Sequence, residues 1–261
     1  MQDIEAYTSV FASTTSTTKA LIDLEKNAKK NSIRASVAAY LTSRRQLPPS
    51  FKIPKLKSPH TNPYYDYWRW SCQQLEWAGP DAGTVRIHQS HHLLPVFFHH
   101  FSCVCPSYES LEIIKQVSTT KPVIEIGSGN GYWAFSLRRL GVQVQAVDNL
   151  ESKWRTTWIS DTIVADGVAY LQKKRGGKGA VLLMLYPVAR SGLTARVLEA
   201  YRGDVVCVVG TQNRSGYTGF KDNTIEEYMA EKMSGFEKSV QVALPSFAGK
   251  DDALFVFEKR A

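Results

Sequence analysis

Three glycines at alternate positions mark the stretch of the chain best suited to chemistry. Gly127, Gly129 and Gly131 follow an apolar run at 123–126, and a helical pattern begins at Tyr132. An apolar run followed by a helix predicts a strand-to-helix turn, where glycines let the backbone bend sharply and approach a bound nucleotide. A dinucleotide fingerprint would need its third small residue at position 132, where Tyr132 is bulky. The spacing therefore favours a nucleotide site but argues against a pyrophosphate, and so against a nicotinamide cofactor.

Two carboxylates follow at the ends of the next two apolar runs. Asp148 stands 17 residues beyond Gly131, and Asp166 precedes Gly167 at the end of a third run. An ionised carboxylate only accepts hydrogen bonds, so Asp148 can accept from both hydroxyls of a ribose. Asp166 can accept from the amino group of adenine, with the Gly167 amide opposite a ring nitrogen. Each acid alone can be explained as a loop or cap residue, but together they predict one adenosine-binding crevice at three strand ends.

The elements that would position these residues begin at about residue 107. From there, short apolar runs alternate with helical segments, which predicts parallel strands covered by helices on both faces. The predicted strands are 123–126, 142–147, 162–165, 180–185 and 205–209, and the predicted helices are 107–117, 132–140, 152–158, 168–174, 194–201 and 224–233. The last two strands, 236–244 and 253–258, are joined by too few residues for a parallel crossover, so they should pair antiparallel. The predicted fold class is α/β, a doubly wound seven-stranded, mostly parallel sheet with a C-terminal antiparallel hairpin and an N-terminal helical and irregular cap.

Residues 107–261 resemble the class I, Rossmann-like S-adenosylmethionine-dependent methyltransferases. The resemblance rests on the pattern acid–x–G–x–G–x–G from Glu125 to Gly131, on the two later acids and on the terminal hairpin. It implies S-adenosyl-L-methionine as the cofactor and methyl transfer to an acceptor that is a small molecule, a protein or RNA. The positions that match the family's cofactor-binding residues are Glu125, Gly127, Ser128, Gly129, Asn130, Gly131, Asp148, Asn149, Asp166 and Gly167.

The resemblance also assigns these positions to parts of the cofactor. It implies that the glycine turn lies against the methionine half, that Asp148 binds the ribose and that Asp166 faces the adenine. Glu125 would anchor the turn and, often through water, the amino group of the cofactor. No closer subfamily is indicated. Residues 1–106 match no motif and are predicted to form a separate N-terminal cap of helical and irregular, aromatic-rich chain.

The acceptor in this family usually binds beyond the fourth strand, where the chain has Leu185-Tyr186-Pro187. Families that methylate planar amide or amino nitrogens have an Asn or Asp there to receive the nitrogen's hydrogens. This chain has neither, which argues against adenine or glutamine N-methylation. Tyr186 is a candidate catalytic residue, and Tyr186 and Pro187 are candidates to line the acceptor pocket, although simple packing explains Tyr186 equally well. After the fifth strand, Gln212 and Asn213 are candidate substrate contacts or parts of a plain turn.

Five of the six histidines lie between residues 88 and 100, close to Cys103 and Cys105. Metal binding is one explanation. However, no second tight pair of ligands stands at a familiar spacing, and Pro95 should interrupt any helix there, so we predict no metal site. His92 is a candidate general base because histidine titrates near neutral pH, and its segment can fold over the cofactor crevice. Packing and surface hydrogen bonds are the more ordinary explanation of these histidines.

The first part of the chain is polar at its start and aromatic towards its end. Residues 1–18 are rich in serine and threonine, so we expect them to be frayed. Apolar residues recur at helical spacing over 19–30 and 33–41. The face shared within the second of these helices is Ile33, Val37, Tyr40 and Leu41. The aromatic residues of 64–77 are predicted mainly to be core that docks this part onto its neighbour, rather than a platform for a flat substrate.

Composition and charge bound the compartment and the partners. The chain has 261 residues, of which 43% are hydrophobic and 21% charged, so wholesale disorder is excluded, and four cysteines are too few for a disulfide scaffold. No apolar run is long enough to cross a membrane and no signal segment is apparent, so we expect a cytoplasmic protein, with the nucleus as an alternative. The segment 19–57 alone accounts for the formal net charge of +8. Attraction to nucleic acid is one explanation of this charge, but a solvated helix face and linker is favoured because no nucleic-acid motif accompanies it.

A second class of function is also consistent with the sequence. The basic segment 19–57 and the missing signature after the fourth strand fit a catalytically silent methyltransferase-fold module that binds RNA or a protein partner. A nicotinamide oxidoreductase is disfavoured by Tyr132. Methyl transfer that depends on S-adenosylmethionine is the function we expect.

Overall fold

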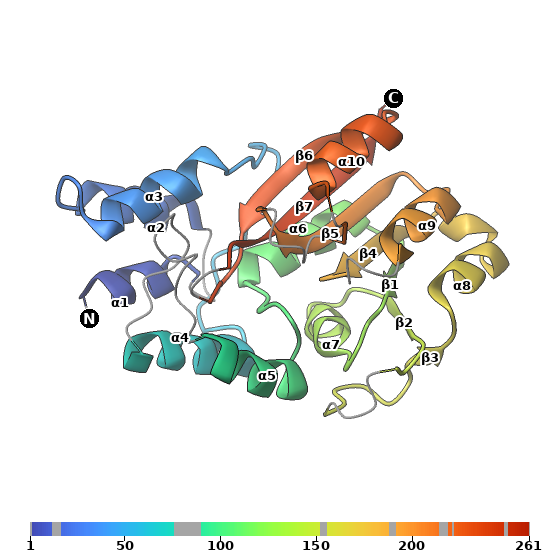
Figure 1. The fold of residues 1–261 in the computed structure, drawn as a ribbon, viewed down its shortest axis with the longest axis horizontal. Coiled ribbons are helices and arrows are strands. Elements are labelled where there is room, and N and C mark those ends of the chain that lie inside the picture. The colour runs from blue at the N-terminus through green and yellow to red at the C-terminus, as the bar shows by residue number, and fades with distance from the viewer. Residues whose placement is uncertain are drawn as a thin grey trace.

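A seven-stranded mixed sheet forms the centre of the computed structural model (Figure 1), which describes residues 2–11, 17–75, 90–151, 156–187, 192–213, 219–220, 222–247 and 250–260. Its strands are β1 (Val123–Ile126), β2 (Val144–Asp148), β3 (Ile163–Val164), β4 (Val181–Leu185), β5 (Val205–Thr211), β6 (Phe236–Ala243) and β7 (Asp252–Lys259). They lie in the order β3-β2-β1-β4-β5-β7-β6, and β1 to β5 are parallel. β7 pairs antiparallel with both β5 and β6. The predicted seven-stranded sheet with its terminal antiparallel hairpin is confirmed.

Helices cover both faces of the sheet. α6 (Tyr108–Ser118) and α7 (Tyr132–Arg139) pack on one face, and α8 (Gly167–Lys173), α9 (Leu193–Ala200) and α10 (Ile225–Lys232) pack on the other. In β5, Cys207 and Val209 belong to the buried cluster on the α6 side, whereas Val206 and Val208 belong to the cluster on the α8 side. Alternate side chains of a strand point to opposite faces, so an entirely apolar strand is stable only between two such layers.

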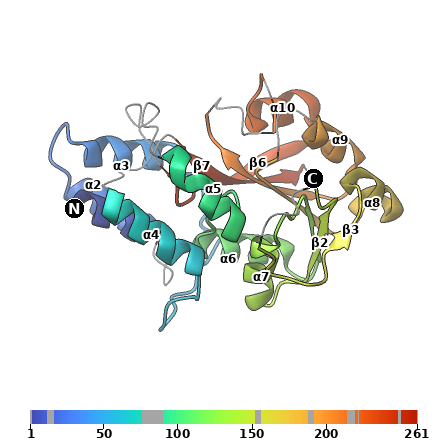
Figure 2. The ribbon, with the colours of Figure 1, turned by 60° about the horizontal axis from the view of Figure 1, so that its bottom comes forward.

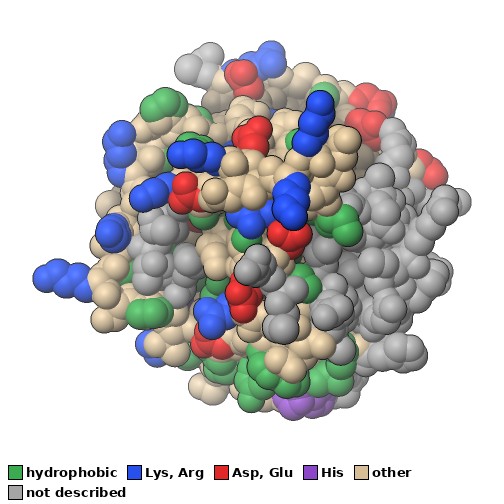
Figure 3. Space-filling view, turned by 90° about the vertical axis from the view of Figure 1, so that its left-hand side faces the viewer, with side chains coloured by type: hydrophobic (Ala, Val, Ile, Leu, Met, Phe, Trp, Pro, Cys, Tyr) green, Lys and Arg blue, Asp and Glu red, His purple; other side chains and the backbone are tan. Residues whose placement is uncertain are grey.

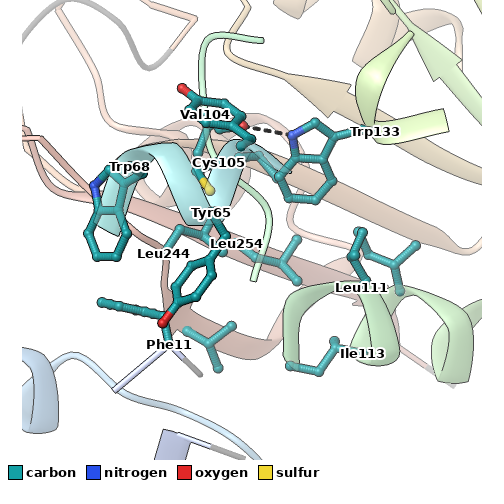
Figure 4. Close-up of a cluster of buried hydrophobic side chains, with 14 of the residues drawn as sticks. Phe11, Tyr65, Trp68, Val104, Cys105, Leu111, Ile113, Trp133, Leu244 and Leu254 are labelled. Carbon is teal, nitrogen blue, oxygen red and sulfur yellow. Dashed lines mark hydrogen bonds between the residues drawn. The ribbon is translucent and has the colours of Figure 1, made fainter. Parts of the chain in front are cut away.

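The N-terminal helices lie together beside the sheet (Figures 1 and 2). They are α1 (Gln2–Ser9), α2 (Thr17–Lys26), α3 (Ile33–Ser43), α4 (Pro63–Leu75) and α5 (Ser90–His100). Tyr65 and Trp68 of α4 belong to one buried cluster with Leu244, which follows β6 (Figure 4). Gln46 also forms an antiparallel bridge with Gln241, so the N-terminal part covers a piece of the sheet's edge strand. The N-terminal helices and one face of the sheet therefore share one core.

The aromatic residues of α4 divide between core and surface. Tyr64, Tyr65 and Trp68 are buried, as predicted for a docking core. Tyr67 and Trp70 are more than half exposed. Trp77 lies outside the described residues.

The expectation that residues 1–18 are frayed is wrong for residues 2–9, which form α1. Ile4 and Tyr7 are buried, and the ring of Tyr7 meets Trp68 edge-on at 5.8 Å. Packing of one face against α4 therefore stabilises a helix that local propensity does not favour. Ile33 also departs from prediction, because it is exposed whereas Val37 on the same helix is buried.

Pro95 does not interrupt a helix, contrary to the prediction, because α5 continues through it. A proline inside a helix removes one N–H, whose carbonyl partner lies four residues earlier. Leu94 and Phe97, on either side of Pro95, are buried, and their packing compensates for this loss. The helix predicted at 152–158 is absent at 156–158, and residues 152–155 lie outside the described part of the chain.

A buried ion pair ties the N-terminal part to α6. Glu109 is 1% exposed, and both of its carboxylate oxygens accept from the guanidinium of Arg45, at 2.8 and 3.0 Å. The Thr17 hydroxyl donates to the same carboxylate at 2.6 Å. A buried carboxylate is stable only when paired and hydrogen-bonded, and this bidentate contact meets that need.

Candidate functional site

The glycine turn leaves β1 and enters α7 with three left-handed residues. Gly127, Gly129 and Gly131 have φ of +75°, +57° and +77°, which residues with a side chain rarely adopt. A Cβ on Gly131 would lie 2.4 Å from Ile159, whereas a Cβ on Gly127 would meet nothing within 4 Å. The amide of Gly127 donates to the carbonyl of Val147 in β2 at 2.8 Å. The turn is thus held at the carboxyl edge of the sheet with open space beside its first glycine.

Asp148, the last residue of β2, lies against the glycine turn. Its Oδ2 accepts from the amide of Gly129 at 2.8 Å, and its Oδ1 accepts from the amide of Leu150 at 2.7 Å. The side chain is only partly buried. Each carboxylate oxygen has two lone pairs, so one on each oxygen remains beyond these two contacts. The structure therefore brings Asp148 against the glycine turn, as the sequence predicts, with capacity left to accept from two hydroxyls.

Four buried polar atoms around the turn have no hydrogen-bond partner among the described residues. They are both carboxylate oxygens of Glu125, Oγ of Ser128 and Nδ2 of Asn130. These residues are 0%, 6% and 2% exposed. Buried polar groups are nearly always paired, and each unpaired one costs about 1–3 kcal/mol. A polar ligand that reaches the turn would satisfy them, so these atoms fit the cofactor that the sequence predicts.

Burial dominates the ionisation of Glu125. It raises the pKa of the Glu125 carboxyl from 4.5 to about 8, and the Asp148 carboxylate adds to the rise. The positive charge of Arg138 opposes this rise only in part. At neutral pH, Glu125 is therefore mostly protonated in the protein without ligand.

We expect Glu125→Gln to flatten the pH dependence of stability. The pKa of about 8 lies above the ordinary 4.5, so between these values the folded chain keeps a proton that the unfolded chain loses. The free energy of unfolding should then fall as pH rises through this window, by up to about 1.4 kcal/mol per pH unit. Urea unfolding at a series of pH values should show a shallower decline in the variant. Ser128→Ala removes an uncharged hydroxyl that has no partner among the described residues, so its stability curve should run parallel to that of the wild type. A Glu125→Gln curve that also runs parallel would contradict the assignment.

Asp166, Gly167 and Asn149 have local roles in the structure. Asp166 is exposed and caps α8, because its Oδ1 accepts from the amide of Ala169 at 2.9 Å. Gly167 is buried where a Cβ would lie 2.4 Å from Ile126. The side-chain Nδ2 of Asn149 donates to the carboxylate of Glu151 at 2.8 Å. Their predicted contacts with a cofactor stay predictions.

Tyr186, a predicted acceptor-pocket residue, directly follows β4. It is 9% exposed and has φ of +47°, an uncommon conformation for a bulky residue. Its amide donates to the carbonyl of Val209 in β5 at 2.7 Å, and its ring lies 6.3 Å from that of Phe98 on α5. Pro187 is half-buried beside it. Strained residues concentrate at functional sites, which is consistent with a pocket-forming role for Tyr186.

Lys250 is a residue of this region that the sequence analysis missed. It precedes β7, is 9% exposed and donates a hydrogen bond to the hydroxyl of Tyr186. Its ammonium also lies 5.0 Å from the centre of the Tyr186 ring. No sequence signal points to it, because it stands in a polar connection between two strands that reads as an ordinary loop.

Gln212 and Asn213 sit at the end of β5. The backbone amide of Gln212 donates to Oδ1 of Asp251 at 3.0 Å. The side-chain Oε1 of Gln212 accepts from the side chain of Gln241 at 2.7 Å. The Gln212 side chain is buried. The carbonyl of Asn213 accepts from Thr211. Gln212 therefore takes part in internal contacts, and a substrate role for both residues stays a prediction.

The histidine segment contributes little that the structure describes. His92 lies in α5, but its side chain is outside the described part, as is all of His88. In the part of the chain that the structure describes, no group of three or more His, Cys, Asp or Glu is placed to hold a metal ion. Likewise, none of the described helices has the length and apolarity needed to span a membrane.

Comparison with known proteins finds similar structures. No family model and no curated protein matches the chain. It is similar to an O-methyltransferase from Bacillus cereus in complex with SAH, with 12% identity and a TM-score of 0.42 over 74% of this chain and 97% of that one. It is also similar to magnesium protoporphyrin IX methyltransferase from Synechocystis PCC 6803 with bound SAM, with 13% identity and a TM-score of 0.40 over 58% and 79%.

A third similar structure is a putative SAM-dependent methyltransferase from Streptococcus mutans. Its identity is 14% and its TM-score 0.41, over 56% of this chain and 46% of that one, so the match spans less than half of that protein. The fold of the present chain, a doubly wound α/β sheet with an antiparallel seventh strand, rests on its own strand order and pairing rather than on these similarities.

Proposed function

We propose that this protein is an S-adenosylmethionine-dependent methyltransferase with residues 1–106 as a cap beside its catalytic domain. The observation that carries the proposal is the group of four unpartnered buried polar atoms on the glycine turn, next to a carboxylate with free lone pairs. When bound, S-adenosylmethionine supplies an electrophilic methyl group on a sulfonium. Glu125, Ser128 and Asn130 would bind its methionine half, and Asp148 its ribose.

The remaining candidate residues extend this proposal along the carboxyl edge of the sheet. Asp166 and Gly167 would face the adenine, and Asn149 would flank the ribose. Tyr186 and Pro187 would bound the acceptor at the end of β4. Methyl transfer is an in-line displacement, so holding the acceptor in line with the sulfonium is the main task of these side chains.

The proposal is tested first by binding and then by transfer. Isothermal titration calorimetry should show one S-adenosylhomocysteine bound per chain and no binding of NADH, which is the control. Incubation with radiolabelled S-adenosylmethionine and a fractionated cell extract should then place label in one fraction, small molecules, protein or RNA. Absence of binding by both S-adenosylmethionine and S-adenosylhomocysteine would refute the proposal.

A catalytically silent module is the second candidate, and the exposed lysines of the segment 19–57 favour it. Lys26 at the end of α2 is exposed, as are Lys29 and Lys30 between α2 and α3. On the face shown in Figure 3, however, Lys and Arg side chains alternate with Asp and Glu, so the positive charge there is not continuous. This candidate requires salt-dependent binding of single-stranded RNA or a partner with no methyl transfer to any fraction.

A further inference from the structure

A buried amine and a phenol meet at the acceptor end of the sheet. Lys250 donates to the hydroxyl of Tyr186, and both residues are 9% exposed. No sequence pattern predicts this contact, because Tyr186 follows β4 whereas Lys250 precedes β7. Two buried titratable groups that share a hydrogen bond are candidates for general acid–base catalysis.

The backbone around Lys250 is fixed from several sides. The Lys250 amide donates to the carbonyl of Phe247 at 2.9 Å, and the ring of Phe247 packs 4.9 Å from that of Phe97 on α5. The indole of Trp68 on α4 donates to the carbonyl of Ser246 at 3.2 Å. The connection between β6 and β7 is therefore clamped by the N-terminal helices, which makes the position of the amine a property of the whole fold.

The charges around Lys250 favour proton uptake over the binding of an anion. The groups that act on it are Asp252, Cys103 and Asp251, and burial lowers the pKa of the Lys250 ammonium against their opposing effect. Asp252 is 2% exposed with Oδ1 unpartnered among the described residues, and burial raises its pKa to about 7. Asp251 accepts from the hydroxyl of Tyr40 at 2.5 Å. One amine beside two carboxyl groups offers little net positive charge to an anionic acceptor.

The pair also lies at the edge of the sheet that carries the glycine turn. Ile126 of β1 pairs with Met184 of β4, so the turn that begins at Gly127 and the residue Tyr186 leave neighbouring parallel strands at the same edge. Thr211 at the end of β5 pairs with Asp252 at the start of β7. Lys250, two residues before Asp252, therefore lies near the same edge. In a doubly wound sheet, ligands bind in the crevice outside the carboxyl ends of the strands.

We propose that Tyr186 and Lys250 act as one proton acceptor for a hydroxyl-bearing methyl acceptor. This inference rests on the proposed function. In the transfer step, an oxygen lone pair forms the new O–C bond, the C–S bond breaks and its electron pair stays on sulfur. The proton of the hydroxyl passes to Tyr186 Oη, which the Lys250 ammonium stabilises in its deprotonated form through its hydrogen bond.

A hydroxyl suits this pair better than a planar nitrogen does. An amino or amide nitrogen needs acceptors for two hydrogens, and Leu185 stands where an amide or acid would provide them. The Tyr186–Lys250 pair has one phenolic oxygen, which matches the single proton of a hydroxyl. Tyr186 is the catalytic residue in this inference, and Lys250 is a positioning residue that acts through it.

The test titrates the protein without cofactor or acceptor. NMR of ¹⁵N-lysine-labelled protein and tyrosinate absorbance are followed together with rising pH. We expect one deprotonation step, seen as a neutral amine or as a tyrosinate, at a lower pH than that of the exposed lysines and tyrosines of the same protein. The step should vanish in Lys250→Met. Its tyrosinate absorbance should vanish in Tyr186→Phe, in which burial alone still lowers the pKa of the Lys250 ammonium. The step should persist in the control Lys232→Met, which alters an exposed lysine. A wild-type protein without such a step would overturn the inference.

Two further measurements separate this inference from the proposed function. S-adenosylhomocysteine affinity should change less than about threefold in Tyr186→Phe, whereas label transfer into the extract should fall at least about 100-fold, the usual size of general-base catalysis. Tyr186→Phe with undiminished transfer would overturn the inference while leaving the methyltransferase proposal intact. Loss of binding by the wild type would instead refute the proposed function, with the titration still measurable.

Discussion

Asp148→Ala is expected to abolish the rise in melting temperature that S-adenosylhomocysteine gives the wild-type protein. At about 100 times its Kd, a ligand that binds only the folded state stabilises it by about 2.7 kcal/mol. For a chain of this size, that stabilisation raises the Tm by about 5–10 °C. Differential scanning fluorimetry with and without the ligand measures the shift directly.

The loss follows from the two hydrogen bonds that the carboxylate of Asp148 would accept from the ribose. Each bond to a charged group contributes about 1.5–3 kcal/mol, so removing both raises the Kd by roughly two to four orders of magnitude. At the same ligand concentration, the remaining stabilisation is then at most about 0.4 kcal/mol, too small to resolve as a shift. The variant also loses the contacts with Gly129 and Leu150.

An exposed acid outside the candidate site provides the control. Asp161 is exposed and pairs with Arg138 at 2.7 Å. Asp161→Ala should keep the full ligand-induced shift. Cooperative melting of Asp148→Ala without ligand shows that the variant is folded. A full shift in that variant would mean that the nucleotide is held elsewhere.

Arg45→Met should destabilise the protein by about 3–5 kcal/mol, the largest loss of stability that we expect from any substitution proposed for this protein. Glu109 would remain 1% exposed and lose both guanidinium hydrogen bonds. Among the described residues, only Thr17 would still donate to it, through its hydroxyl and its backbone amide. Urea unfolding measures the change in free energy from the shift in midpoint.

The expected contrast with other substitutions makes this prediction specific. Arg45→Met combined with Glu109→Gln should recover much of the loss, because the double variant has no unpaired buried charge. Lys121→Met breaks an exposed ion pair with Asp204 and should cost about 0–1 kcal/mol. A loss below about 1 kcal/mol for Arg45→Met would show that the N-terminal part does not depend on this pair.

Local patterns were enough for the sheet and for the arrangement of the glycine turn and Asp148. The apolar run at Val123–Ile126 and the three glycines after it each state a backbone requirement within a few residues. Asp148 was found because parallel strands bring their carboxyl ends to one edge, so position in the chain implies position in space. The antiparallel hairpin followed in the same way, since the connection between its strands is too short to cross the sheet.

The N-terminal part could not be read in this manner. α1 has a polar, threonine- and serine-containing sequence, and it forms because Tyr7 meets Trp68 from a helix far along the chain. α5 tolerates Pro95 because its neighbours are buried. In both cases, long-range packing outweighs local propensity.

The sequence by itself determined the succession of strands and helices in the sheet domain, the glycine turn and the acids at the strand ends, because these depend on spacing and backbone conformation. Only the tertiary structure decided that Lys250 lies against Tyr186, residues that are far apart in the chain. Such a contact depends on how β7 pairs with β5 and on the helices that clamp the preceding connection. Burial then changes the ionisation of Lys250 and Glu125, and burial is a property of the packed molecule that no short stretch of residues carries.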